Sequence, residues 1–413
     1  MRFNSRVYNT LYYTMKKKIL AIPNGHLLAH TTRVLEVAKA LREFGFDVQF
    51  ATDGRFTAII QDQGFKIIPI SMVSAEQVLS CCRNGRVNWD NYPMLKKSVQ
   101  DDLDLFKKVK PCLVIGDLRL SLSTSCEVAC IPYVSILNAA WTNYYAVRFR
   151  APEHFLPTRL LGYRITTRLM PIIKRLILKH DHRPYAKIRR EMGLKPGDNI
   201  FDIWKGDLNL LPDIPEYAPT RNLPENFHYI GPIVWEPNYP APQWLKKVDS
   251  GKPTIYFTMG STGYPRFFKT ALDVFGNSEY RCIMTTGGMA SFEHFPSNFS
   301  IVDYAPGSGI MQKSDVVVCH GGNGTVYQAM KNGIPIIGIP TMHDQEFNMQ
   351  RVEDLGIGIQ LSEIKFEPEH LRHAVKRVLS TERYKTNARK YQTILKSYDG
   401  PLRGATIINS FVN

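Results

Sequence analysis

The chain has 413 residues, 44% of them hydrophobic and 22% charged, a composition that excludes wholesale disorder and a length that predicts two domains. Its seven cysteines are an odd number without a CxxC pair, which excludes a disulfide framework and a zinc ribbon and favours a cytoplasmic protein. No uninterrupted apolar run reaches the roughly 18 residues of a membrane span.

Strand-like and helical runs alternate through the first half of the chain. The run "MKKKILAIP" predicts a first strand, so residues 1–14 are expected to be an extension that precedes Met15. The runs that follow are "TTRVLEVAKALREFG", "DVQFAT", "FTAIIQDQG", "FKIIPI" and, after a gap, "CLVIG", "SLSTSCEVAC" and "PYVSIL". Continuous apolar strands are typical of a parallel sheet that is covered on both faces. Residues 15–235 are therefore predicted to form one doubly wound α/β domain, with residues 71–100 irregular.

The positive charge is concentrated in residues 159–195. This segment holds eleven Lys and Arg against Asp181 and Glu191, a net +9 within the formal +15 of the chain. Helical spacing places four basic residues beside four aliphatic ones, namely Arg164, Arg168, Arg175 and Lys179 beside Ile165, Leu169, Ile172 and Leu176. Because proline interrupts helices, we expect two shorter helices, the second beginning at Pro171.

Such a basic amphipathic segment has two interpretations. Its charged face can simply be solvated while the helix packs on its own domain. Alternatively, residues 159–195 dock on an anionic membrane surface, which makes the protein peripheral at the inner membrane face. Nucleic acid is not expected as a partner, because no helix-turn-helix, zinc-finger or RNA-binding aromatic motif accompanies the charge.

A second alternating series begins after a proline-rich stretch. Residues 236–250 are expected to be a linker, and residues 251–392 are predicted to form a second doubly wound domain. Its strand-like runs are "TIYFTMGS", "YRCIMTTGG", "FSIVDYAP", "SDVVVCHGG" and "IPIIGIP". Ligands of such sheets bind beyond the carboxyl ends of the strands, so the two domains are expected to face each other across a binding cleft.

The run "VVVCHGGNGTVYQAMKNG" places a glycine-rich turn between a buried strand and a helix. Gly321 and Gly322 let the backbone approach a ligand closely, and the free N–H groups at the helix start attract phosphate. A tight strand–helix turn also needs glycine for steric reasons alone, so the turn has a purely structural interpretation as well. It is neither a Walker loop nor a GxGxxG fingerprint.

The longer run "HGGNGTVYQAMKNGIPIIGIPTMHDQEFN" resembles the donor-binding signature of the UDP-glycosyltransferase family, of the bacterial macrolide and sterol type. Together with "YFTMGS" and "VDYAP", the resemblance covers about residues 230–360 well and the first domain more loosely. It implies the GT-B fold, in which two Rossmann-like domains face each other across a cleft. It also implies that residues 393–413 return to the first domain.

The resemblance implies a role for each residue that matches the signature. His320, Gly322, Gly324, Thr325 and Ser261 would hold the diphosphate of a nucleotide sugar. Asp344 and Gln345 would bind the hydroxyl groups of the transferred sugar. Because these groups would stabilise the departing diphosphate, neither a metal ion nor another cofactor is expected.

Two positions depart from the family pattern. Tyr304 stands where many members have a tryptophan that stacks on uracil, and Gly307 stands where a glutamine usually follows. Gln328 replaces the glutamate that usually binds the ribose hydroxyls. Tyrosine can still stack on a base and glutamine can still form hydrogen bonds, so a UDP-sugar is expected and a thymidine diphosphate donor stays open.

Two histidines, His26 and His30, stand before the first long helix. In the family, a histidine at this helix start deprotonates the acceptor hydroxyl, and an aspartate after a later strand orients its ring. "KPCLVIGDLRLS" resembles the family's aspartate motif and identifies Asp117. The dipeptide "GH" favours His26, but counting back eight residues from Ala38 favours His30, which we take as the base with His26 as the alternative. The reaction implied is an inverting transfer.

The acceptor is expected to be a hydrophobic small molecule or lipid that carries a hydroxyl group. Residues 71–100 and 138–200 are expected to form its pocket, with Trp141, Tyr144 and Tyr145 as lining or core residues. Two alternatives to a hexosyltransferase are kept. One is a sugar-nucleotide epimerase of the same fold, and the other is a basic peripheral membrane-binding protein with a vestigial nucleotide site.

Overall fold

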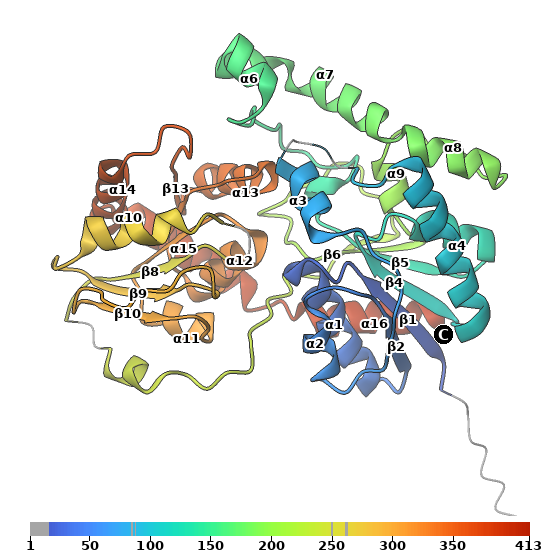
Figure 1. Ribbon diagram of the computed structural model, residues 1–413, viewed down its shortest axis with the longest axis horizontal. Coiled ribbons are helices and arrows are strands. Elements are labelled where there is room, and N and C mark those ends of the chain that lie inside the picture. Colours follow the sequence, from blue (N-terminus) through green and yellow to red (C-terminus); the bar gives the residue numbers. More distant parts are fainter. Residues whose placement is uncertain (1–15, 84–85, 87, 249–250, 261–262) are drawn as a thin grey trace, which may run out of the picture.

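Two parallel sheets, each covered by helices on both faces, stand side by side in the computed structural model (Figure 1). The structure describes residues 16–83, 86, 88–248, 251–260 and 263–413. Ser261 and the expected extension, residues 1–14, lie outside these ranges. The predicted α/β class with two doubly wound halves is confirmed.

The first sheet has seven parallel strands in the order β3-β2-β1-β4-β5-β6-β7. Their bounds are β1 Lys18–Pro23, β2 Asp47–Ala51, β3 Ile67–Ile68, β4 Leu113–Asp117, β5 Tyr133–Ile136, β6 Leu208–Leu211 and β7 Phe227–Tyr229. The strand order reverses between β1 and β4, where Pro23 pairs with Asp117. The segments that leave these two strands therefore part at this point, which is where ligands of such sheets bind.

The second sheet has six parallel strands in the order β10-β9-β8-β11-β12-β13. Their bounds are β8 Thr254–Thr258, β9 Arg281–Thr285, β10 Phe299–Val302, β11 Val316–Cys319, β12 Ile336–Gly338 and β13 Gly358–Gln360. Its order reverses between β8 and β11, where Thr258 pairs with Cys319. The glycine-rich turn that follows Cys319 thus begins at the switch point of this sheet.

Helices fill the connections of the first half. They are α1 Leu28–Glu43, α2 Thr57–Gln61, α3 Ala75–Arg83, α4 Tyr92–Val109, α5 Leu122–Ala129, η1 Ala139–Trp141, α6 Leu156–Leu161, α7 Tyr163–Asp181, α8 Arg183–Glu191 and α9 Phe201–Trp204. The expectation that residues 71–100 are irregular is wrong, because α3 and the start of α4 lie there. α4 begins with an N-cap, Asn91, whose side chain accepts from the Met94 N–H.

The second half and the end of the chain contain the remaining helices. These are η2 Gln243–Lys247, α10 Arg266–Phe275, α11 Gly307–Met311, α12 Asn323–Asn332, α13 His343–Asp354, α14 Pro368–Ser380, α15 Glu382–Leu395 and α16 Gly400–Val412. None of the helices in the described ranges has the length and apolarity needed to cross a membrane.

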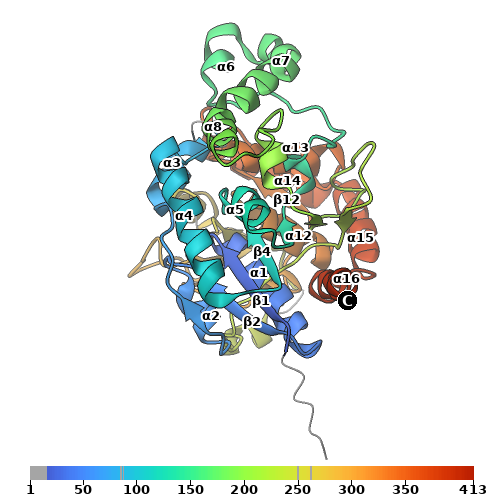
Figure 2. The same ribbon diagram turned by 90° about the vertical axis from the view of Figure 1, so that its right-hand side faces the viewer.

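The final helix, α16, packs against α1 of the first half (Figure 2). Ala405 and Ile408 are fully buried in the same apolar cluster as Val34 and Leu41 of α1. The Lys17 ammonium also donates to the Val412 carbonyl, at 3.1 Å. The end of the chain therefore contributes to the core beneath α1.

The expected break at Pro171 is wrong, because α7 runs without interruption from Tyr163 to Asp181. Proline cannot donate to the carbonyl four residues earlier, which here belongs to Thr167. The guanidinium of Arg148 donates to that carbonyl at 3.5 Å and to the Arg168 carbonyl at 2.7 Å. A side chain from outside the helix thus replaces the lost donor, and the helix continues.

Candidate functional site

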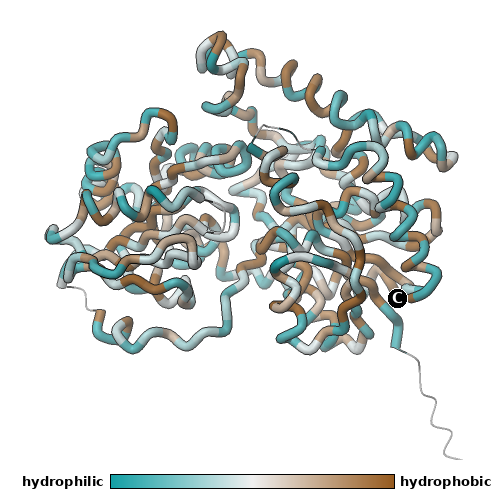
Figure 3. The backbone as a smooth tube through the Cα atoms, viewed as in Figure 1, coloured by the Kyte–Doolittle hydropathy of each residue, from teal (hydrophilic) through white to brown (hydrophobic). Residues whose placement is uncertain are grey.

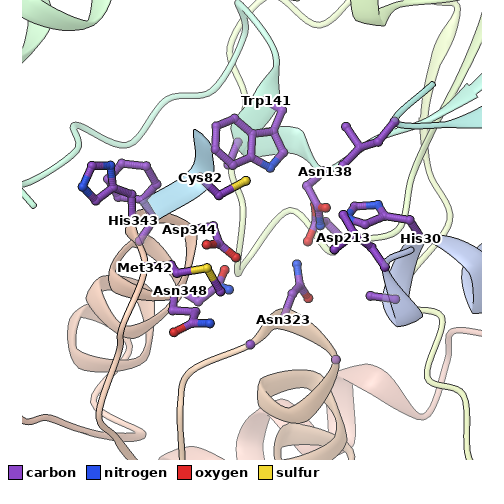
Figure 4. A pocket seen from close by; sticks show the side chains of 18 of the residues that line it. His30, Cys82, Asn138, Trp141, Asp213, Asn323, Met342, His343, Asp344 and Asn348 are labelled. Carbon is purple, nitrogen blue, oxygen red and sulfur yellow. The ribbon is translucent and has the colours of Figure 1, made fainter. Parts of the chain in front are cut away.

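A cavity of about 420 Å³ lies between the two halves, at the carboxyl ends of both sheets (Figure 4). The first half contributes the start of α1 and parts of α3, η1, α7 and α9 to its wall. The second half contributes the first turns of α12 and α13. The predicted cleft between two facing domains is confirmed.

His30 lies in the first turn of α1 and lines this cavity. Its Nδ1 is 2.7 Å from Oδ1 of Asp117, whose carboxylate is fully buried at the end of β4, while the His30 ring is 20% exposed. In the tautomer in which Nδ1 carries the ring proton and donates to this carboxylate, Nε2 is the nitrogen that can accept a proton. The structure thus pairs the two residues, 87 positions apart, that the motifs identify.

Arg33, one helical turn after His30, binds the same carboxylate. Its Nε donates to Oδ2 of Asp117 at 2.9 Å, and one of its terminal nitrogens lies 2.8 Å from Nδ1 of His30. A buried carboxylate needs such compensation for its lost hydration. The spacing of three residues, which puts Arg33 on the same helix face as His30, is the sequence signal that could have identified it.

His26 lies in the loop before α1, and its ring is not part of the cavity wall. Its backbone N–H donates to the Asn24 side chain at 3.1 Å. Among the described residues no carboxylate pairs with its imidazole. The geometry therefore favours His30 over His26 as the basic residue of the cleft.

Hydrogen bonds connect this cluster to the second half. Arg33 donates to Asn138 Oδ1 at 2.7 Å, and the Asn138 amide lies 3.3 Å from Oδ2 of Asp213. The hydroxyl of Tyr327, on α12, donates to the other oxygen of Asp213 at 2.9 Å. Burial raises the pKa of Asp213, although the hydrogen bonds from Tyr327 and Asn138 act to lower it. Asn138 and Asp213 were not identified from the motifs, although each closely follows a predicted or observed strand of the first sheet.

The ring of His320 lies between Gly322, in the glycine-rich turn between β11 and α12, and Gly260, which follows β8. A Cβ atom on Gly260 or Gly322 would lie 2.3 or 2.5 Å from this ring, so glycine is needed at both positions. His320 is buried, its Nδ1 has no partner within the described part of the chain, and burial lowers its pKa to about 4. A neutral imidazole with an unused polar atom therefore stands beside the cavity.

The first turn of α12 is open to a ligand. Its N-cap, Gly322, offers no side-chain acceptor, so the first N–H groups of the helix are not capped by that residue. Gly324 and Thr325 line the cavity, and a Cβ on Gly324 would meet no atom within 4 Å. The N–H groups at the start of the helix and the helix dipole together make this turn suitable for an anion.

Asp344 and Gln345 lie in the first turn of α13 and also line the cavity. Burial raises the pKa of Asp344, although two backbone N–H groups and the nearby His30 oppose the rise. The side-chain oxygen Oε1 of Gln345 accepts from the Thr341 N–H at 2.8 Å. In Figure 4, Asp344 and Asn348 of α13, Asn323 of α12 and His30 surround one open space.

Two of the predicted donor residues are placed differently from the others. Tyr304 is 57% exposed, outside the cavity wall, and donates its hydroxyl to the Gly287 carbonyl at 2.8 Å. Gln328 lines the cavity, and its amide donates to Glu236 Oε1 at 2.5 Å. Glu236 belongs to the segment that connects the halves, and no motif identified this carboxylate. A Cβ on Gly307 would lie 2.7 Å from the Gln328 amide. The glycine that replaces the usual glutamine at position 307 therefore makes room for Gln328.

The part of the cavity next to α7 is apolar and aromatic. Trp141 and Tyr145 line it, whereas Tyr144 packs on Phe227 with ring centroids 5.2 Å apart. Burial lowers the pKa of Lys174 to about 8, and its ammonium lies 4.1 Å from the ring centroid of Phe149. No group of three or more His, Cys, Asp and Glu side chains in the described ranges is arranged to hold a metal ion.

Comparisons with known proteins identify what this chain is similar to. A family model described as "Erythromycin biosynthesis protein CIII-like, C-terminal domain" matches residues 270–401. The chain is 34% identical to the "PGL/p-HBAD biosynthesis glycosyltransferase" of Mycobacterium tuberculosis (strain ATCC 25177 / H37Ra), over 91% of this chain and 88% of that protein. It is 33% identical to the "PGL/p-HBAD biosynthesis rhamnosyltransferase" of Mycobacterium bovis (strain BCG / Pasteur 1173P2), over 90% of this chain and 83% of that protein.

A solved structure shares the fold. "Spinosyn Rhamnosyltransferase SpnG complexed with thymidine diphosphate" superposes with a TM-score of 0.72 at 17% sequence identity, over 96% of this chain and 100% of that one. At this sequence identity the likeness shows that the two proteins share a fold.

Proposed function

This chain belongs to the UDP-glycosyltransferase family with the GT-B fold and is a glycosyltransferase. We propose that it moves a hexose from a uridine or thymidine diphosphate sugar to a hydroxyl group of a hydrophobic acceptor. The observation that carries the proposal is the pair formed by the partly exposed His30 and the buried Asp117 carboxylate, which lies near Asp344 at the same cavity. The relative named a rhamnosyltransferase supports a hexose-derived sugar, and the complex with thymidine diphosphate supports the nucleotide.

We propose that His30 is the general base. Its Nε2 would take the proton of the acceptor hydroxyl while the oxygen attacks the anomeric carbon, and Asp117 would stabilise the imidazolium that forms. The carbon–oxygen bond to the diphosphate breaks on the opposite face of the sugar, so the transfer inverts the anomeric configuration. Arg33 would be a positioning residue, because it fixes the Asp117 carboxylate.

The turn before α12 would bind the diphosphate. Its open N–H groups, Thr325 and the neutral His320 are all donors close to the cavity, and their interaction with the leaving diphosphate would strengthen as negative charge develops on it. Asp344 and Gln345 would bind the sugar hydroxyls, and Gln328 with Glu236 would bind the ribose.

A pair of matched variants tests the base. We expect His30→Gln to lower sugar transfer by about 10²–10⁴-fold, because a positioned base is lost, and His26→Gln to leave the rate within about twofold. Transfer is measured with UDP- and TDP-linked hexoses and a set of phenols and long-chain alcohols. Normal transfer by His30→Gln, with loss in His26→Gln, would reverse the assignment.

Nucleotide binding is measured separately by thermal unfolding with UDP, TDP, GDP and ADP. A nucleotide at 100 times its dissociation constant stabilises the folded state by about 2.7 kcal/mol, and we expect this shift with UDP or TDP in both histidine variants. Absence of a shift with every nucleotide would contradict the donor site.

The names of the relatives favour neither the epimerase nor the binding protein. An epimerase would form product without an acceptor.

A further inference from the structure

Helices α6 and α7 form an arm that stands out from the body of the molecule (Figures 1 and 2). Large aliphatic side chains on this arm are exposed to solvent. Leu156 and Leu160 of α6 are 62% and 74% exposed, and Ile172 and Leu176 of α7 are 62% and 64% exposed. An isolated exposed leucine is ordinary, but a contiguous set on one element indicates a binding surface.

The exposed side chains of α7 form one stripe. Ile165, Leu169, Ile172 and Leu176 recur at intervals of four, three and four residues, which places them on a single helix face. The opposite face is also apolar and is covered, since Met170 and Leu178 are buried against the body and line the cavity. Figure 3 shows hydrophobic stretches along the length of α7. One helix therefore separates the cavity from an outer apolar surface.

Basic side chains border the stripe. Arg164, Arg168, Arg175 and Lys179 are exposed, and within the described residues none of them has a carboxylate partner. The sequence contains no Asp or Glu between Glu153 and Asp181. Exposed aliphatic groups beside unpaired positive charges of one sign are complementary to an anionic lipid surface, which offers phosphates next to acyl chains.

We propose that the outer face of α6 and α7 docks on an anionic phospholipid surface. The aliphatic stripe enters the boundary between headgroups and acyl chains, and the four basic side chains contact lipid phosphates. A protein partner would need a matching run of carboxylates together with an apolar groove. An anionic lipid surface offers negative phosphates and apolar acyl chains at every point. Docking is independent of donor and acceptor, so it can be tested apart from the proposed reaction.

Co-sedimentation with vesicles tests the docking. The full chain is mixed at low salt with vesicles of phosphatidylcholine alone or of phosphatidylcholine with phosphatidylglycerol. We expect binding to the anionic vesicles only, and weaker binding as salt is added, because salt screens the lysine and arginine charges. Equal binding to both vesicle types, or no binding to either at low salt, would overturn the proposal.

Two double variants separate charge from insertion. Arg168→Gln with Arg175→Gln should weaken binding to anionic vesicles roughly 30-fold, and Ile172→Ser with Leu176→Ser about tenfold. The matched control is Lys376→Gln with Arg377→Gln on α14, two exposed basic residues of the second half, which should bind as the unmodified chain does. All four positions on α7 are exposed, and circular dichroism checks that each variant is folded.

The remaining outcomes also decide the question. Binding that the serine variant leaves unchanged would show charge adsorption without insertion and would overturn the docking of the aliphatic stripe. Loss of vesicle binding in the control variant as well would assign the binding to overall charge instead of the arm. If the chain binds no vesicles, and the variants on α7 change its association with a protein, this face is a protein interface and the proposal is overturned.

Discussion

His320 shows how burial sets the chemistry of a single side chain. Its ring is enclosed by two glycines, no described side chain compensates a positive charge on it, and its pKa falls to about 4. It is therefore neutral at physiological pH and can donate one hydrogen bond without repelling nearby cations. His30, in contrast, is partly exposed and has a carboxylate partner, so the two histidines suit different tasks.

The burial of His320 predicts a pH dependence of stability. In the unfolded chain the ring takes up a proton below about pH 6.5, whereas in the folded protein it does so only near pH 4. The free energy of unfolding should therefore fall as the pH drops from about 6.5 to 4, by about 3 kcal/mol from this residue. His320→Asn should lose this contribution, and urea unfolding from pH 7 to 4.5 measures it.

An exposed histidine provides the control for that measurement. His373 on α14 has a side chain that is 71% exposed, so His373→Asn should follow the pH profile of the unmodified protein. If His320→Asn also follows that profile, the ring is not buried as neutral imidazole.

At the scale of elements, the strand–turn–helix units place the functional groups. β1 leads into α1 with His30, β4 ends at Asp117, and β11 leads through the glycine turn into α12. Each unit ends at a switch point of its sheet, where neighbouring connections diverge and leave room for a ligand. In the turn before α12, His320 fills the space beside both Gly260 and Gly322.

A single methyl group should disturb this turn. In Gly322→Ala the new Cβ would lie 2.5 Å from the His320 ring, so either the ring or the turn must move. We expect the dissociation constant of UDP or TDP to rise about tenfold or more, because the phosphate donors are displaced. Isothermal titration calorimetry measures it.

Gly309→Ala is the matched control. This glycine lies in α11, and its added Cβ would only reach ordinary contact with Leu245, at 3.6 Å. Nucleotide binding should stay within about twofold, since the change does not touch the cavity wall. Equal binding by both alanine variants would show that the crowding at position 322 does not control the site.

At the scale of the whole molecule, contacts between the halves define the cleft. Arg150 of the first half pairs with Glu353 and Asp354 at the end of α13, at 2.7 and 2.6 Å, and Gln350 donates to the Arg148 carbonyl at 2.9 Å. The last helix adds a second connection, because α15 packs in the second half and α16 packs on α1. The base-bearing helix α1 is thus held by residues from the far end of the chain.

Truncation of one side chain on α16 should destabilise the protein. Ile408 is fully buried against α1, so Ile408→Ala removes apolar contacts and leaves a cavity, at a cost of about 2–5 kcal/mol. Phe411 on the same helix is 42% exposed, and Phe411→Ala should change stability much less. Urea unfolding compares them, and similar effects from both changes would contradict the docking of α16 as described.

Much of the architecture was predictable because burial leaves a local pattern. Continuous apolar runs and helical runs alternate wherever a parallel sheet is covered on both faces, so the α/β class and both doubly wound halves follow from the order of residues alone. The glycine turn before α12 and the position of His30 at the start of α1 are likewise local features, readable from spacing.

Only the tertiary structure decided the features that depend on residues far apart in the chain. Arg33 meets Asn138 across 105 positions, and Asp213 meets Tyr327 across 114, so no local pattern could pair them. Pro171 stays within one helix, and Arg148 donates to the Thr167 carbonyl that the proline leaves without its helical donor. The sequence determined that α7 is amphipathic and basic, but which apolar face is covered depends on where the helix packs. A periodic pattern specifies a face, and only the arrangement of the chain in space determines what that face meets.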